Sequence, residues 1–245
     1  MTAKTILIIG GTSDISLALA RRYAALGQHL ILTARDVSKL DADMADARVR
    51  GAASARAVAF DLLQTEQYGA FIDSLGVLPD TIVCMAGIMS DQPAAQRDGA
   101  LAEAMMVTNY VGPVLLLGAF ANRMEQRGSG CIVGVSSVAG DRGRYSNYIY
   151  GSSKAGFTAF LAGLRARMAR ANVHVMTVKP GFINTRMVAH MTPPPLITAQ
   201  PDDVAAAIIR GVDARSNVIY VLKRWRWIMM IVTHIPECIA KKLGW

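Results

Sequence analysis

The sequence has 245 residues, of which 52% are hydrophobic and 18% charged. These proportions allow a substantial core and exclude a disordered chain, which is poor in apolar residues. The formal net charge of +8 suggests an anionic partner: a phosphorylated cofactor, membrane headgroups or nucleic acid. Nucleic acid is not expected, because the sequence has no basic groove interleaved with aromatic residues and no recognition motif.

Short apolar runs alternate with longer amphipathic stretches along the chain. The predicted strands are residues 5–9, 29–33, 55–59, 81–85, 130–135, 174–179 and 218–221. The helical periodicity predicts helices over residues 16–26, 64–75, 100–126, 153–170 and 201–214. Alternating strands and helices, with strands apolar throughout, indicate a parallel sheet covered on both faces. The predicted fold class is α/β: a single-domain Rossmann doubly wound parallel sheet over residues 1–221, followed by a tail over residues 222–245.

Cysteine usage and the amino-terminal sequence bear on location and metals. Cys84, Cys131 and Cys238 are too few and too scattered for a disulfide framework or a metal site, so we expect reduced thiols and no metal. The first apolar run, residues 6–9, is too short for a secretory signal and is not followed by a small-residue cleavage site. We therefore expect a cytoplasmic protein.

A glycine-rich turn follows the first predicted strand, where ligands of such sheets bind. Residues 10–16 read Gly-Gly-Thr-Ser-Asp-Ile-Ser and lead into a helix. A turn of this kind lets the backbone approach a diphosphate at the helix amino terminus. Asp14 and Ser16 stand where the G-x-x-x-G-x-G pattern has glycine, and an ordinary capped turn is the alternative. The candidate cofactor contacts here are Gly10, Thr12, Ser13, Asp14 and Ile15.

The ends of the second and third predicted strands bear on cofactor choice. Arg35 follows the second strand, where an arginine accommodates the 2′-phosphate of NADP and an acid would bind the ribose of NAD. Arg35 therefore indicates NADP(H), with a solvated loop charge as the alternative. Asp61 and Leu62 follow the third strand and are candidate cofactor contacts. Asp61 would reach an adenine edge or, alternatively, cap the next helix.

A serine, a tyrosine and a lysine form the candidate catalytic group. Tyr150 comes thirteen residues after Ser137, which ends a predicted strand, and Lys154 follows four residues later. Helical positions four apart share a face, so we expect the ammonium to lower the pKa of the phenol from about 10. The phenol then serves as an acid–base group, and Ser137 hydrogen-bonds a substrate carbonyl. Alone, Y-x-x-x-K is typical of a surface helix; the serine and the glycine turn favour catalysis.

These motifs resemble the short-chain dehydrogenase/reductase family over nearly the whole chain. The four active-site residues of that family match Asn109, Ser137, Tyr150 and Lys154. Residues 84–87, Cys-Met-Ala-Gly, resemble its Asn-Asn-Ala-Gly segment with both asparagines replaced. Residues 180–185 resemble its segment that contacts the nicotinamide carboxamide and the diphosphate. The cofactor-binding residues that the resemblance implies are Ala86, Gly87, Tyr150, Lys154, Pro180, Gly181, Ile183 and Thr185.

The resemblance implies hydride transfer between NADP(H) and a carbonyl or carbinol carbon, with reduction of a ketone as the expected direction. Tyr150 would donate the proton, Lys154 would hold the nicotinamide ribose, and Asn109 would support a water-mediated proton relay. Members of this family often pair through their long helices, so a homo-oligomer is expected. A catalytically silent NADP-binding sensor or scaffold is an alternative. The complete set of four residues argues against it.

The tail is basic and apolar. Residues 218–245 contain five basic residues and one acidic residue, Glu237. The apolar run at 225–235 is too short for a spanning helix, which needs roughly 20 residues. Tryptophans flanked by lysine and arginine suit a helix at a membrane surface. A core or oligomer-interface helix is the alternative.

With this tail, the sequence resembles a bacterial branch of the family, the decaprenylphosphoryl keto-pentose (2-keto sugar) reductases. That resemblance implies a lipid-phosphate-linked keto-sugar substrate and peripheral contact with the inner face of the membrane. Arg142 and Arg144, near the catalytic serine, would meet the substrate phosphate or, alternatively, are solvated loop charges. The alternative function is that of a soluble carbonyl or 3-oxoacyl reductase, in which the tail is an interface or lid element.

Overall fold

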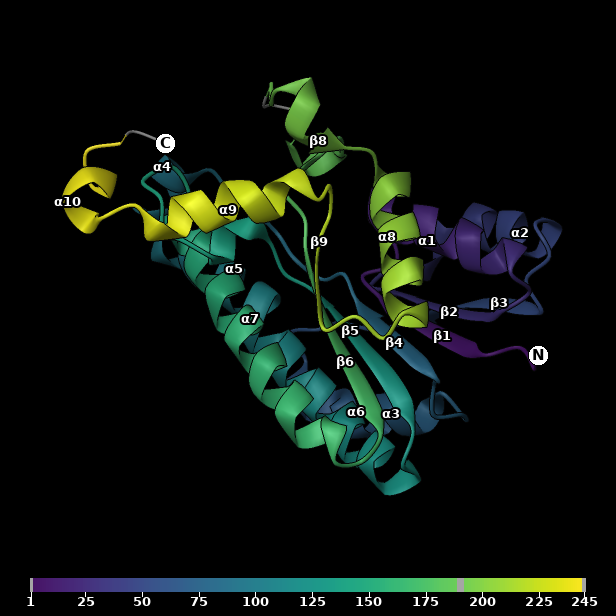
Figure 1. Ribbon diagram of the computed structural model, residues 1–245. Coiled ribbons are helices and arrows are strands. Elements are labelled where there is room, and N and C mark those ends of the chain that lie inside the picture. Colours follow the sequence, from purple (N-terminus) through teal and green to yellow (C-terminus); the bar gives the residue numbers. More distant parts are fainter. Residues whose placement is uncertain (1, 189–191, 244–245) are drawn as a thin grey trace.

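Seven parallel strands form the centre of the protein, in the order β3-β2-β1-β4-β5-β6-β9 (Figure 1). The computed structural model describes residues 2–188 and 192–243. The strands are β1 (Thr5–Ile9), β2 (His29–Ala34), β3 (Ser54–Ala59), β4 (Thr81–Cys84), β5 (Gly130–Val135), β6 (Val173–Lys179) and β9 (Val218–Tyr220). Each predicted strand is present, with ends within one residue of the prediction. The strand order reverses between β1 and β4, the switch point at which such sheets bind ligands.

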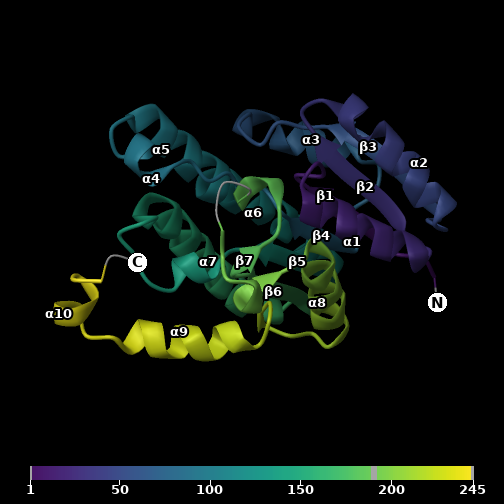
Figure 2. The same ribbon diagram turned by 90° about the horizontal axis from the view of Figure 1, so that it is seen from above.

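Helices cover both faces of the sheet, as predicted (Figure 2). One face carries α1 (Asp14–Ala25), α2 (Asp41–Val49) and α8 (Pro201–Asp213). The other carries α3 (Tyr68–Ser74), α6 (Gly112–Arg127) and α7 (Tyr148–Ala169). Successive side chains of a strand point to opposite faces, so Ile6 and Ile8 pack under α1 while Leu7 and Ile9 pack under α6. This two-sided burial explains why the central strands β1, β4 and β5 are almost entirely apolar, whereas the edge strand β3 has exposed Ser54 and Arg56.

The long predicted helix over residues 100–126 is not one regular helix. The structure has α5 (Gly99–Met106), a π-helical turn η3 (Val107–Val111) and then α6. A π turn places one extra residue in the helix and is frequent at functional sites. Here it contains Asn109, whose side-chain Oδ1 accepts from the Ile88 N–H at 2.7 Å and whose Nδ2 donates to the Ile88 carbonyl at 2.8 Å. The helical run 99–127 has the length and hydropathy of a membrane span. It is nevertheless a core helix, because Leu116 and Phe120 are fully buried under the sheet.

Several short elements escaped prediction. They are α2, α4 (Gln92–Ala95), α10 (Glu237–Ala240), the small parallel pair β7 (Phe182–Ile183) and β8 (Thr198–Ala199), and the 3-10 turns η1 (Val37–Leu40), η4 (Val138–Gly140), η5 (Arg186–Val188) and η6 (Pro195–Ile197). The predicted helix over residues 64–75 starts as another such turn, η2 (Thr65–Gln67), before α3. In α2 only Met44 and Ala47 are buried, which leaves too little apolar periodicity to detect.

The tail folds back onto the domain. Helix α9 (Arg224–His234) lies across the end of the sheet at which β6 and β9 terminate (Figure 1). Trp225, Met229 and Val232, spaced three to four residues apart, are buried on its inner face against Val138, Phe182 and Tyr220. Its outer face exposes Trp227, Met230 and Ile231. The helix is therefore amphipathic, and its inner face packs against the rest of the protein.

Candidate active site

The glycine turn combines a left-handed glycine with a side-chain cap. Gly10 has φ = 81°, a conformation that favours glycine, and its N–H donates to Thr33 Oγ1 at 3.3 Å. The Ser13 hydroxyl accepts from the Ser16 N–H at 3.1 Å and caps α1. The Ser16 hydroxyl donates to the Gly10 carbonyl at 2.8 Å. Ser16, which stands where the pattern has glycine, thus stabilises the turn by hydrogen bonds to Ser13 and Gly10.

The second departure from the glycine pattern, Asp14, is neutralised by a distant arginine. The backbone N–H and Nε of Arg186 each donate to the Asp14 carboxylate at 2.9 Å. Nη2 of Arg186 also donates to the Thr12 carbonyl at 2.7 Å. The carboxylate therefore has a cationic partner, and the amino terminus of α1, which favours negative charge, stays suited to a diphosphate.

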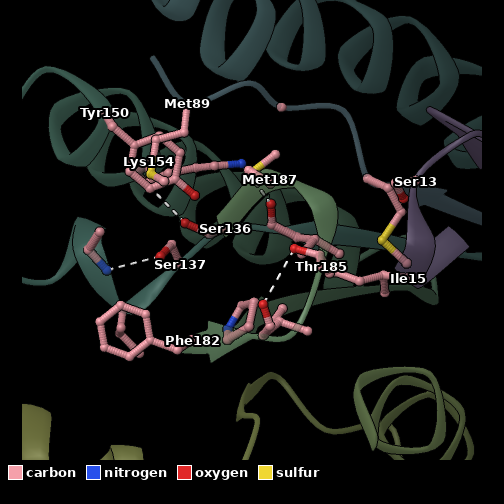
Figure 3. A pocket seen from close by; sticks show the side chains of 18 of the residues that line it. Ser13, Ile15, Met89, Ser136, Ser137, Tyr150, Lys154, Phe182, Thr185 and Met187 are labelled. Atoms are coloured by element: carbon pink, nitrogen blue, oxygen red, sulfur yellow. Dashed lines mark hydrogen bonds between the residues drawn. The ribbon is translucent and has the colours of Figure 1, made fainter. Parts of the chain in front are cut away.

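Helix α7 begins earlier than predicted and carries two of the candidate catalytic residues. Tyr150 lies in its first turn and Lys154 one turn later. The turn η4 packs directly on this helix: a β-carbon on Gly140 would lie 2.7 Å from the Ala155 nitrogen. This close approach brings Ser137, at the end of β5, to the same side of the cavity as Tyr150 and Lys154 (Figure 3).

Lys154 is almost completely buried. Only 4% of the residue is exposed, and its Nζ donates to the Val135 carbonyl at 3.1 Å. The Nζ lies 5.9 Å from the centroid of the Tyr150 ring. Burial disfavours the charged ammonium and lowers the pKa of Lys154 to about 8.

The predicted lowering of the Tyr150 pKa is wrong. Burial raises the pKa of the phenol above its ordinary value, while the Ser137 hydroxyl and the charge of Arg144 act against that rise. The sequence suggested Lys154 as the lowering cation, but burial of the phenol outweighs every such contribution. Tyr150 is consequently a neutral phenol at neutral pH, with a proton to give.

Asn109 lies behind the cavity wall. It is fully buried, and besides its two bonds to Ile88 its Nδ2 donates to Ser153 Oγ at 3.2 Å. Ser153 Oγ in turn donates to the Tyr150 carbonyl at 2.7 Å. The amide therefore ties the π turn to α7, next to the catalytic residues.

A cavity of about 530 Å³ runs from the glycine turn to the candidate catalytic residues. Figure 3 shows Ser13 and Ile15 at one end and Tyr150 and Lys154 at the other, with Thr185 between them. This volume lies within the usual range for ligand sites. The predicted residues on its wall are Thr12, Ser13, Asp14, Ile15, Gly87, Ser137, Tyr150, Lys154, Pro180, Gly181, Ile183 and Thr185.

Six predicted residues are outside that wall: Gly10, Arg35, Asp61, Leu62, Ala86 and Asn109. Arg35 is exposed at the end of β2. Asp61 accepts from the Leu63 N–H at 3.0 Å, in the turn that precedes η2, and does not cap that helix. Leu62 is buried and its carbonyl accepts from the Tyr68 hydroxyl at 2.5 Å. Asp61 and Leu62 therefore make hydrogen bonds within the protein and do not line the cavity.

Other wall residues were missed by sequence reasoning. They are Lys39, Met85, Met89, Val135, Ser136, Val138, Ala139, Asn147, Phe182, Arg186, Met187 and Trp225; Arg144, which the sequence had suggested for a substrate phosphate, also lines the cavity. Lys39, four residues beyond Arg35, was detectable as a second cation after β2. Trp225 had no local signal, because it reaches the cavity only through the packing of α9.

The residues present suit a dinucleotide. The first residues of α1 and the cation Lys39 line one end of the cavity, beside the turn that begins at the left-handed Gly10, and the tyrosine and lysine line the other. Together with the switch point of a parallel sheet, this arrangement defines a dinucleotide-binding enzyme of the Rossmann type.

Comparison with known proteins gives the family. The short chain dehydrogenase family model matches residues 4–195, and the chain belongs to this family of oxidoreductases. It is 36% identical over 245 residues to an uncharacterized oxidoreductase of Mycobacterium tuberculosis, covering 98% of this chain and 97% of that one. It is 35% identical over 248 residues to one of Streptomyces coelicolor, covering 98% and 96%. Among solved structures, a short-chain dehydrogenase from Sphingobium yanoikuyae in complex with NADPH superposes with a TM-score of 0.82 at 26% identity, covering 96% and 97%.

Proposed function

We propose that this protein is an NADPH-dependent ketone reductase. The observation that carries the proposal is a single cavity with a phosphate-binding turn at one end and Tyr150, a protonated phenol, at the other. When bound, NADPH supplies the hydride that adds to the carbonyl carbon. Tyr150 gives its proton to the carbonyl oxygen, and the Ser137 hydroxyl holds that oxygen by a hydrogen bond. The product is the corresponding alcohol.

The remaining predicted residues would hold the cofactor and support the proton donor. The turn residues Thr12 to Ile15 face the diphosphate, and Lys154 holds the nicotinamide ribose. The segment 180–185 borders the nicotinamide. Asn109 fixes the start of α7 and supports return of a proton to Tyr150. A silent sensor or scaffold would have no use for a buried lysine and a tyrosine held in this way.

The choice of NADPH over NADH is proposed from the cations after β2. Arg35 and Lys39 both follow this strand, and Lys39 lines the cavity. The Sphingobium relative, solved in complex with NADPH, supports the same choice. We expect purified protein to bind NADPH at least tenfold more tightly than NADH, which is about 1.4 kcal/mol. Fluorescence titration with each nucleotide measures this ratio.

The matched variant is the double substitution Arg35→Gln with Lys39→Gln. It is expected to remove most of the preference by weakening NADPH binding, while NADH affinity changes little because NADH has no 2′-phosphate. Equal affinities in the unmodified protein, or an intact preference in the double variant, would overturn the NADP assignment.

We further propose a keto-sugar linked to a lipid phosphate as the substrate. The support is the position of α9: its inner residue Trp225 lines the cavity, while its outer residues Trp227, Met230 and Ile231 are 51–67% exposed. A helix placed in this way rests on the inner face of a membrane and opens the cavity toward a lipid-anchored head group. A soluble carbonyl or 3-oxoacyl reductase remains the competing function, and one 27% identical relative from Nostoc is named a ketoacyl reductase.

Flotation with lipid vesicles tests the membrane contact. We expect the protein to bind phosphatidylglycerol vesicles, and Trp227→Ala with Ile231→Ala to reduce binding by at least tenfold, because each buried apolar side chain contributes about 1.5–3 kcal/mol. Lys223 and Arg226 are exposed and attract anionic headgroups, so we expect weaker binding to neutral phosphatidylcholine than to phosphatidylglycerol. Val49→Ala, on α2, is the control, since Val49 is 88% exposed and belongs to neither the tail nor the long helical run.

We also propose a homo-oligomer, supported by exposed Leu101, Val111 and Leu115 on the long helical run.

The double variant Trp227→Ala with Ile231→Ala also tells a membrane contact of α9 from a subunit contact. If light scattering shows that the α9 variant loses mass while vesicle binding was absent from the start, α9 is a subunit interface and the membrane contact is wrong.

A further inference from the structure

One arginine on the cavity wall has a buried donor with no acceptor among the described residues. Arg144, in the loop between η4 and α7, lines the cavity together with Tyr150. Its Nε is buried and has no hydrogen-bond partner in the described part of the chain. Burying a hydrogen-bond donor without an acceptor costs free energy, so this arrangement is unfavourable in the protein alone. A ligand that supplies an anion would remove the cost.

The neighbouring cations are engaged elsewhere. Arg142, the other arginine of this loop, donates to the Glu237 carboxylate at 2.6 Å and to the Thr233 carbonyl at 3.4 Å. Arg186 is held by Asp14, and Lys154 donates to the Val135 carbonyl. Of the two loop arginines suggested for a substrate phosphate, the structure leaves Arg144 at the cavity and directs Arg142 to the tail.

A second unpartnered polar atom lies in the same loop. The side-chain Oδ1 of Asn147 is buried without a hydrogen-bond partner among the described residues, and Asn147 also lines the cavity. It is an acceptor, so it complements a hydroxyl, while Arg144 complements an anion. Met89, Phe182 and Met187 contribute apolar surface to the wall.

We propose that Arg144 binds an anionic group, phosphate or carboxylate, on the head group of the substrate that also bears the ketone. This rests on the reductase function proposed above and narrows it to anionic hydroxy ketones, with Asn147 accepting from a hydroxyl. The charge of Arg144 already acts on the pKa of Tyr150, so the anion site and the proton donor are neighbours. An anion bound by Arg144 therefore belongs to the part of the substrate that carries the ketone and not to a distant lipid chain.

Matched ketones test the proposal. Rates of NADPH oxidation are measured with xylulose 5-phosphate against xylulose, and with 4-oxopentanoate against its methyl ester. We expect kcat/KM to favour the anionic member of at least one pair by about 30-fold, the size typical of a hydrogen bond to a charged group. The pair with the larger ratio tells phosphate from carboxylate.

Variants of the loop locate the effect. Arg144→Met is expected to bring the anionic-to-neutral ratio close to 1, and Arg144→Lys to restore part of it. Arg142→Met is the matched control: it makes the same chemical change two positions away and is expected to keep the ratio. A ratio near 1 in the unmodified protein, or an unchanged ratio in Arg144→Met, overturns the proposal.

A binding measurement separates this proposal from the reductase function. Inorganic phosphate is titrated into the protein loaded with NADPH, and the nucleotide fluorescence is followed. Saturable binding that is lost in Arg144→Met supports the anion site even if no ketone is reduced. If both members of each pair are reduced equally and phosphate does not bind, the reductase function stands and the anion site is wrong.

Discussion

Replacing Tyr150 with phenylalanine is expected to lower kcat for ketone reduction by about 10³-fold, within the range of general-acid catalysis. The phenol lines the cavity, and its raised pKa keeps it protonated. The ring remains in Tyr150→Phe, so the shape of the cavity is kept while the proton donor is lost. NADPH affinity is therefore expected to change by less than about threefold, because the hydroxyl donates its proton to the substrate. Steady-state NADPH oxidation and fluorescence titration measure the two quantities.

The chain offers a matched control two residues away. Tyr148 is exposed, and its hydroxyl donates to Gln96 Oε1 at 3.1 Å, outside the cavity. Tyr148→Phe is expected to retain turnover within about twofold. Full activity in Tyr150→Phe would refute the assignment of the proton donor, and loss of NADPH binding in that variant would show a structural defect in place of a chemical one.

Lys154→Met is expected to abolish turnover and at the same time to stabilise the folded protein at pH 7. Burial lowers the pKa of this lysine from 10.5 to about 8, and each pKa unit corresponds to about 1.4 kcal/mol. The variant removes that cost but also the hydrogen bond to Val135. We expect a net gain of about 2 kcal/mol in the free energy of unfolding, measured by urea denaturation. A gain of this size would show that Lys154 lowers the stability of the unmodified protein in return for its role in the active site.

The stabilisation has a defined pH dependence. Because the folded-state pKa of Lys154 lies below its unfolded value, the unfolded chain binds more protons between about pH 8 and pH 10.5. The free energy of unfolding of the unmodified protein is thus lowered in full below about pH 8, and this loss shrinks as the pH rises toward 10.5. The difference between the two proteins should fall by more than half from pH 7 to pH 10. Lys242→Met, at an exposed site, is expected to show no such change. A pH-independent difference for Lys154→Met would mean that burial does not lower the pKa of Lys154.

Local patterns in the sequence predicted the fold well. Short apolar runs located each strand of the central sheet within one residue, because most positions of a strand covered on both faces are buried. The spacing of Tyr150 and Lys154 predicted that they share a helix, since the relation depends on only one turn of backbone. The π turn at Asn109 was not predictable in this way. Its extra residue is stabilised by bonds to Ile88, which lies 21 residues away in the chain.

The sequence by itself determined the order of the sheet strands and of the main helices between them, the glycine turn and the positions of Ser137, Tyr150 and Lys154. All of these follow from residue type and short spacing. Only the tertiary structure decided how charge is balanced in the cavity. Arg186 neutralises Asp14 across 172 residues, and burial, which depends on the whole core, reverses the expected direction of the Tyr150 pKa shift. The structure also decided which loop arginine has no partner in the described part of the chain, because the partner of Arg142 is Glu237, in a tail that folds back over 95 residues.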